Sequence, residues 1–206
     1  MIISEIIKQL VLTFIVNGGV YALWYFPFQL CSLPMYLLPL YAICRSKKVK
    51  EAILTFLMTY TLVGGIAVFF DQSGLHYTLP ILTLHSYLWH IFLIVIGINS
   101  GLIFIKCQRS RKSSFRPFIQ ASTIYLISCL IAEIINLSLD DFGNINMFYI
   151  NPDFKMAQIV FKDLVPVIGN DLTIVVYILA TILGAFLFYL AWRSIERCLI
   201  KRTNFG

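Results

Sequence analysis

A thiol and an imidazole lie in two separate apolar stretches of the chain. The stretch FPFQLCSLPMYLLPLY at residues 26–41 contains Cys31, and the stretch near 79–105 contains His90. A cysteine becomes a nucleophile when a nearby base takes its proton, and histidine is a common partner in that role. We therefore interpret Cys31 and His90 as a candidate catalytic pair. The alternative for Cys31 is a small hydrophobic residue that only packs.

Other polar side chains in the same apolar stretches are candidates for binding a substrate. Gln29 and Ser32 flank Cys31, while Glu133 and Asn136 lie in the stretch near 117–138. Gln29, Ser32 or Asn136 would each be able to donate a hydrogen bond to an oxyanion, and the sequence does not choose between them. The alternative for Glu133 is a hydrogen bond to Asn136 one helical turn further on.

The composition places these residues in a membrane. The 206 residues are 59% hydrophobic and only 13% charged, with a mean hydropathy of +0.84, which is far from the average of soluble domains. A helix needs about 20 mostly apolar residues to cross a bilayer. We predict an all-α, polytopic transmembrane helix bundle that forms one membrane domain over 1–206, with five full spans and a short N-terminal helix. The spans are expected near 26–44, 51–70, 79–105, 117–138 and 172–192, and the short helix near 2–16.

The basic residues predict the orientation, because cytoplasmic loops retain Lys and Arg. They gather between the first and second spans, between the third and fourth, and after the last. We therefore expect a multi-pass protein of the cell membrane with a cytoplasmic C-terminus and an extracytoplasmic segment at 138–171. Within that segment, residues 156–165 suit either a short interfacial helix or an ordinary loop. The basic residues are Arg45, Lys47, Lys48, Lys50, Lys106, Arg109, Arg111, Lys112, Arg116, Arg193, Arg197, Lys201 and Arg202.

The same charge pattern argues against other classes of function. Basic loops account for the net charge of +6, and no aromatic residues are interleaved with Arg as on a nucleic-acid-binding surface, so we expect no nucleic-acid partner. The five cysteines form no CxxC pair and no Cys/His zinc spacing. No phosphate loop or dinucleotide fingerprint is present, so we expect no metal and no cofactor. Membrane lipids are the expected partners.

Helical rise predicts that the candidate residues share one layer. Counting 1.5 Å per residue from the basic anchors puts Cys31 about 21 Å, His90 about 24 Å and Asn136 about 30 Å above the cytoplasmic boundary. Gly64 and Gly65 fall at about the same height, where they allow helices to approach closely. In a hydrocarbon core about 30 Å thick, this layer is the outer leaflet near the headgroups.

Helical phase distinguishes two histidines of one span. Ser86, Tyr87 and His90 share a face with Gly97 and Gly101, and this polar face is expected to turn toward the bundle. Ser86 and Tyr87 are therefore further candidates for substrate binding. His85 falls almost opposite, where we expect a packing hydrogen bond or an interfacial position.

Four segments resemble the bacterial YwaF family of integral membrane proteins. In chain order they are FPFQLCSLPMYLLPL, VGGIAVFFD, SYLWHIFLIVIG and IINLSLDDFGNINMFYINP. That family is similar to the transmembrane-protein-164-type acyltransferases, and the resemblance implies Cys31 as nucleophile and His90 as base. The chain departs from the family in a shorter first helix and in the segment LVPVIGND, which lacks an aromatic-rich GPxP pattern.

These residues predict acyl transfer or ester hydrolysis inside the membrane. The Cys31 thiolate would attack a phospholipid ester, and the acyl group would pass to a lysolipid or to water. Two alternatives remain open at this point: a small-molecule-binding subunit of a transporter, in which polar residues coordinate a ligand, and a non-catalytic membrane protein.

Overall fold

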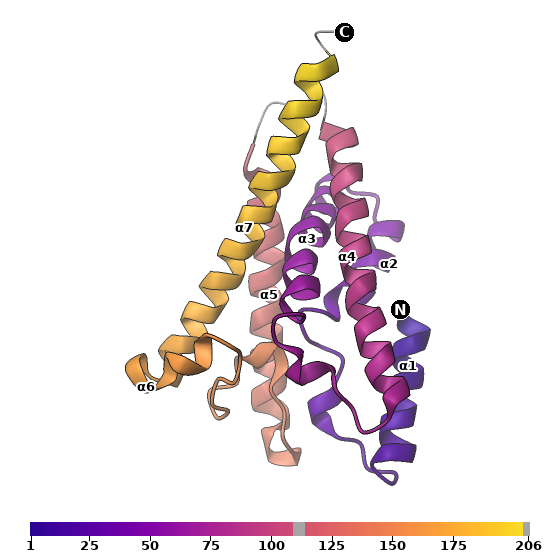
Figure 1. Ribbon diagram of the computed structural model, residues 1–206, viewed down its shortest axis with the longest axis vertical. Helices are drawn as coiled ribbons and strands as arrows, with labels where there is room; N and C mark the ends of the chain where they lie inside the picture. Colours follow the sequence, from indigo (N-terminus) through magenta and orange to yellow (C-terminus); the bar gives the residue numbers. More distant parts are fainter. Residues whose placement is uncertain (109–113, 204–206) are drawn as a thin grey trace.

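The computed structural model describes residues 1–108 and 114–203, apart from the side chains of 73, 107, 108 and 200–203. The described residues form helices and no strands (Figure 1). Arg109, Arg111 and Lys112 lie outside the described residues, as do the side chains of Lys201 and Arg202. The α-helices are α1 Ile2–Leu10, α2 Leu33–Ile43, α3 Lys47–Ala67, α4 Pro80–Gln108, α5 Arg116–Leu139, α6 Val165–Ile168 and α7 Asn170–Thr203. The shorter turns are η1 Val11–Val16, η2 Leu23–Tyr25, η3 Gln72–Leu75, η4 Asp140–Phe142, η5 Met147–Tyr149 and η6 Phe161–Asp163.

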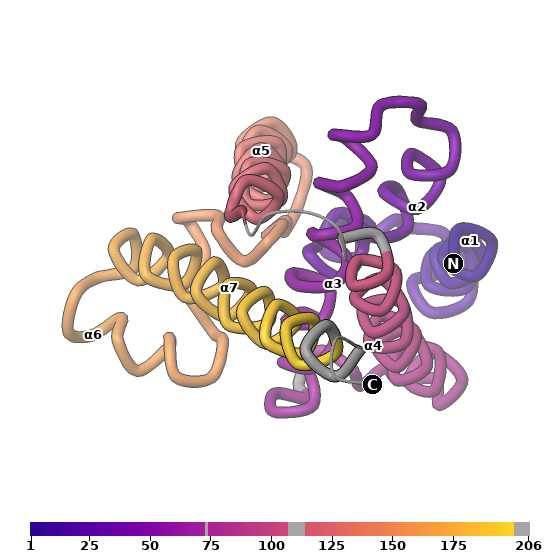
Figure 2. The backbone as a smooth tube through the Cα atoms, turned by 90° about the horizontal axis from the view of Figure 1, so that it is seen from above, coloured from indigo at the N-terminus to yellow at the C-terminus, as the bar shows by residue number. Residues whose placement is uncertain are grey.

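Four helices, α3, α4, α5 and α7, are long and apolar enough to cross a membrane. Helix α3 is central and largely buried, because α2, α4, α5 and α7 all pack against it. Seen from above, α1 and α2 lie on one side of α3 and α5 and α7 on the other (Figure 2). Many large apolar side chains on the outer faces of these helices are exposed, as lipid contact requires. The chain is therefore an all-α membrane protein.

The expected first full span differs from the structure. Within 26–44 only α2 is helical, and its 11 residues extend about 16 Å, roughly half of the hydrocarbon core. Residues 26–32 form bends and turns instead and include Pro27, while Pro34 lies in the first turn of α2, where a missing N–H is tolerated. The count of five full spans is thus not confirmed. The N-terminal helix at residues 2–16 is present as α1 followed by η1.

Glycines set the close packing of α3, α4 and α7. A Cβ on Gly97 would lie 2.5 Å from the Leu62 side chain, and one on Gly101 would lie 2.3 Å from the Trp192 ring. The Trp192 indole uses this space to donate a hydrogen bond of 3.0 Å to the Met58 carbonyl. The small-residue face of α4 therefore turns inward, as predicted.

The segment between α5 and α7 is compact without a long helix. The expected helix at 156–165 is absent, since only the three-residue turn η6 and the start of α6 are helical there, so the loop alternative is confirmed. Amide side chains hold this segment instead: Asn170 donates to the carbonyls of Pro152 and Phe154, both at 3.0 Å. The segment lies at the end of the bundle opposite to the C-terminus (Figure 1).

Candidate functional site

Cys31 lies where three elements meet, in the turn that precedes α2. The Trp89 indole of α4 donates a hydrogen bond of 3.0 Å to the Cys31 carbonyl. On α3, Gly64 lies against this turn, since a Cβ there would be in ordinary contact, 3.5 Å from the Leu30 side chain and 4.0 Å from the Cys31 nitrogen. Met1 and Cys31 pack against the same buried group, which includes Met35 and Trp89. Cys31 and Gly64 thus share the layer that helical rise predicts.

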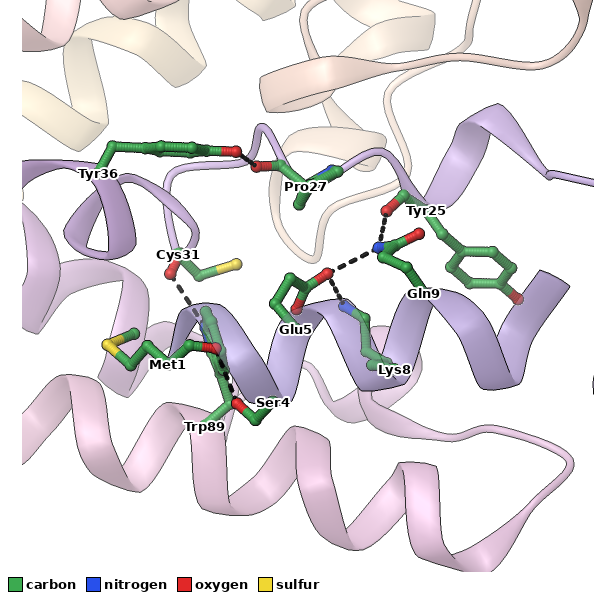
Figure 3. A network of polar contacts seen from close by, with 10 residues as sticks. All are labelled: Met1, Ser4, Glu5, Lys8, Gln9, Tyr25, Pro27, Cys31, Tyr36 and Trp89. Carbon is green, nitrogen blue, oxygen red and sulfur yellow. Dashed lines mark hydrogen bonds and ion pairs between the residues drawn. The ribbon is translucent and has the colours of Figure 1, made fainter.

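A polar cluster on α1 accompanies the thiol. Glu5 is only 5% exposed and pairs with Lys8 at 2.8 Å. The Gln9 amide donates to the Glu5 carboxylate at 2.7 Å and to the Tyr25 carbonyl at 2.6 Å (Figure 3). Helix α1 therefore carries a paired and hydrogen-bonded charge into the apolar layer, as the cost of burying a carboxylate requires.

The charges of α1 act on the Cys31 thiol. Burial raises the pKa of Cys31 above its ordinary value, and Lys8 and the adjacent Ser32 hydroxyl oppose this by favouring the thiolate, whereas Glu5 adds to the increase. Figure 3 shows the thiol directed toward the first turns of α1. A thiol with a raised pKa needs a base to react at neutral pH.

An apolar groove lies beside this cluster, between α1 and the residues that start α2. Its volume is about 350 Å³, at the lower end of the range for ligand sites. Glu5 and Gln9 belong to the lining residues, but the exposed surface of the groove is almost wholly apolar. The lining residues are Ile2, Glu5, Ile6, Gln9, Leu10, Pro27, Met35 and Tyr36.

His90 is buried, and its hydrogen-bond partner is not Cys31. Its Nδ1 bonds to the Ser86 carbonyl at 2.8 Å. One turn further on, Ile94 packs against Gly65 of α3, so His90 lies on the α3 side of α4. Among the described residues no hydrogen bond joins the Cys31 thiol and the His90 ring. It is Trp89, the neighbour of His90, that contacts Cys31.

His85 differs from His90 both in the face of α4 that it occupies and in its hydrogen bonding. Its ring lies 5.7 Å from the Trp89 ring, on the side of α4 that faces Cys31. Both ring nitrogens are buried and have no hydrogen-bond partner among the described residues, so the expected packing hydrogen bond is absent. The charged groups that act on the ring are Lys8, Glu5 and the Met1 amino group, all of them at or in α1.

Gln29 and Asn136 clamp the turn η5. Gln29 donates to the Asn146 carbonyl at 2.9 Å and accepts from the Phe148 N–H at 2.7 Å. Asn136 accepts from the Met147 N–H at 2.6 Å and donates to the Met147 carbonyl at 3.3 Å. These bonds hold Phe148 in the left-handed region at φ 57°, which is uncommon for a residue other than glycine. Gln29 or Asn136 could therefore bind a substrate only if its hydrogen bonds to η5 were broken.

The other predicted site residues are dispersed. The Asn136 amide donates to the Glu133 carboxylate at 3.3 Å, so the alternative for Glu133 is confirmed. Tyr87 donates to Gln72 at 3.0 Å, in the turn between α3 and α4. Ser86 is buried, and its carbonyl is the group that His90 bonds. Only Ser32 lies directly beside the thiol.

Two tyrosines near the thiol were not predicted as site residues. Cys31 is among the groups that act on the hydroxyls of Tyr77 and Tyr149. Burial raises the pKa of Tyr149 to about 12 and raises that of Tyr77 as well, so both hydroxyls remain hydrogen-bond donors at neutral pH. The sequence held no periodic signal for them, because Tyr77 lies in a loop and Tyr149 ends the three-residue turn η5. Glu5 and Lys8, by contrast, were visible as charges that interrupt an apolar helix.

Comparison with family models, curated proteins and solved structures finds no match to the chain. No group of three or more His, Cys, Asp or Glu side chains suited to a metal ion occurs in the described part of the chain.

Proposed function

We propose that this chain is a membrane-embedded enzyme that cleaves or transfers the acyl group of a lipid ester through Cys31. The observation that carries the proposal is a buried thiol whose thiolate Lys8 favours and which packs against the buried group that includes Met35, a residue that also lines the apolar groove. The acyl chain of a lipid ester would suit the apolar groove, and its polar carbonyl would suit the side of the cation. The resemblance to YwaF proteins, which marks Cys31 as nucleophile, agrees with this assignment.

In the proposed reaction a histidine of α4 takes the proton from the Cys31 sulfur. The thiolate attacks the ester carbonyl, the bond from carbon to the leaving oxygen breaks, and that oxygen takes the proton back from the imidazolium. A lysolipid hydroxyl or water then cleaves the thioester. His85 and His90 are the two histidines of α4 that are candidates for this base. The hydroxyls of Tyr77 and Tyr149 and that of Ser32 are the groups placed to stabilise the oxyanion.

We propose the outer leaflet of the cell membrane as the location of this reaction, with the C-terminus in the cytoplasm. The starts of α3 and α5 and the ends of α4 and α7 lie at one end of the bundle, and the basic residues follow these helix ends (Figure 1). Cytoplasmic loops retain such residues. The turns at 26–32 enter from the other end, where acyl esters of the outer leaflet lie.

The test is covalent labelling. Purified protein is incubated with a phospholipid that carries a labelled acyl chain, and the thioester at Cys31 is detected by its release with neutral hydroxylamine. The expected result is label on the parent protein and none on Cys31→Ala. A folded parent that forms no thioester and releases no fatty acid would contradict the proposal.

A second function is favoured by the groove itself. Glu5 and Gln9 in an apolar wall are also suited to holding a polar ligand without reaction, as in the binding subunit of a transporter. Ligand retention that is unchanged in Cys31→Ala, together with no lipid turnover, would support this function.

A further inference from the structure

We propose that His85, rather than His90, is the general base that accepts the proton of the Cys31 thiol. This inference rests on the proposed function and adds a catalytic residue to it. Both histidines lie on α4, so the choice depends on which face of that helix is turned toward Cys31.

The hydrogen bond of Trp89 identifies that face. Its indole donates to the Cys31 carbonyl at 3.0 Å, and His85 lies one turn before it with the two rings 5.7 Å apart. Residues four apart share a face of a helix. His90 is rotated by about 100° from Trp89, and its Nδ1 is already bonded to the Ser86 carbonyl at 2.8 Å. The geometry thus places the His85 ring on the face of α4 whose Trp89 contacts the Cys31 turn.

The His85 ring is free to take a proton. Both of its nitrogens are buried without a hydrogen-bond partner among the described residues, which is uncommon because a buried polar group without a partner is destabilising. No hydrogen bond joins His85 to the thiol in the structure, so the transfer requires a rotation of the Cys31 side chain or one bridging water. Apo sites commonly show such loose geometry.

The pair lies among the charges of α1. Lys8 and Glu5 act on both the thiol and the His85 ring, and the Met1 amino group acts on the ring as well. After the transfer, Lys8 favours the thiolate and Glu5 favours the imidazolium, whereas Glu5 opposes the thiolate and both Lys8 and the Met1 amino group oppose the imidazolium. The remaining titratable groups that face the thiol are the neutral hydroxyls of Tyr77 and Tyr149, described above, and that of Tyr177 on α7.

The experiment measures the reactivity of the thiol independently of any lipid substrate. In a background in which Cys44, Cys107, Cys129 and Cys198 are replaced by Ser, the alkylation rate of Cys31 by a small iodoacetamide is followed from pH 6 to 10. We expect His85→Gln to slow alkylation at pH 7 by about tenfold, with recovery at high pH, whereas His90→Gln keeps the parent profile. The reverse pattern, or equal profiles in all three proteins, would overturn the proposal.

Rescue by added imidazole distinguishes a role of His85 as a base from a role in packing. Added imidazole is expected to restore the alkylation rate of His85→Ala at pH 7, and failure of rescue in a monodisperse His85→Ala protein would count against the base role. Thioester formation from labelled phospholipid is measured on the same samples. His85-dependent alkylation without any thioester would refute the proposed lipid chemistry and leave the His85–Cys31 pair standing.

Discussion

At the residue scale, the molecule is organised around one thiol and the charges of α1. The Cys31 turn receives a hydrogen bond from α4, packs against a glycine of α3 and faces Glu5 and Lys8. The free energy of burying these two charges is offset by their pairing at 2.8 Å. The consequence is a cysteine whose ionisation depends on side chains from a different helix.

Substitution of Cys31 tests whether its sulfur reacts or only packs. Cys31→Ser changes size and polarity little, but a hydroxyl is a much poorer nucleophile, so lipid turnover should fall by about a hundredfold or more. The measurement is acyl release by monodisperse protein, and an unchanged melting temperature serves as the control. Parental turnover in Cys31→Ser would show that the residue packs.

The charges of α1 should tune the thiol in opposite directions. Lys8 favours the thiolate and Glu5 disfavours it, so Lys8→Met should raise the pKa of Cys31 further and Glu5→Gln should lower it. Since the thiolate is the reactive form, alkylation at pH 8 should slow about threefold in Lys8→Met and accelerate in Glu5→Gln. Alkylation rates that move in the same direction in both variants would contradict this electrostatic account.

At the element scale, the contacts of α4 show which glycines are packing requirements. A Cβ on Gly101 would lie 2.3 Å from the Trp192 ring of α7, whereas one on Gly184 would meet Val63 at 3.4 Å, an ordinary contact. Gly101→Ala should therefore destabilise the protein by about 1–3 kcal/mol through overpacking. Gly184→Ala is the matched control and should leave the melting temperature in detergent nearly unchanged. Equal melting temperatures for Gly101→Ala and Gly184→Ala would mean that α7 can move away from α4 with little loss of stability.

The turn η5 depends on amides from two distant segments. Asn136→Leu leaves the buried N–H of Met147 without its partner, at a cost of about 1–3 kcal/mol, while the Met147 carbonyl keeps only the hydrogen bond from the Ile150 N–H. We expect faster protease cleavage within residues 146–156 and a lower melting temperature. Asn99→Leu, on an exposed position of α4, is the control and should behave like the parent. Since Gln29 holds the same turn, Gln29→Leu combined with Asn136→Leu should be less than additive.

For the molecule as a whole, the orientation of the chain across the membrane can be measured directly. Lys155 is exposed in the segment between α5 and α7, and Lys48 is exposed at the start of α3. In the absence of other cysteines, Lys155→Cys should react with an impermeant maleimide added outside intact cells. Lys48→Cys should react only after permeabilisation. The opposite labelling would reverse the orientation and move the site to the inner leaflet.

The sequence by itself determined the class of the protein and the position of its long helices. Composition and apolar length depend on neither contacts nor register, so they predicted an all-α membrane protein, and the inward face of α4 followed from helical phase alone. Helical rise predicted that Cys31 and Gly64 lie at about the same height.

The contacts between segments were decided by the tertiary structure. Proline and turn residues limited the expected first span to α2, and this cannot be read from hydropathy. The hydrogen bond from Trp89 to the Cys31 carbonyl shows which face of α4, the one that also carries His85, meets the Cys31 turn. Periodicity does not contain this information, because long-range contacts set the partner of a helix face.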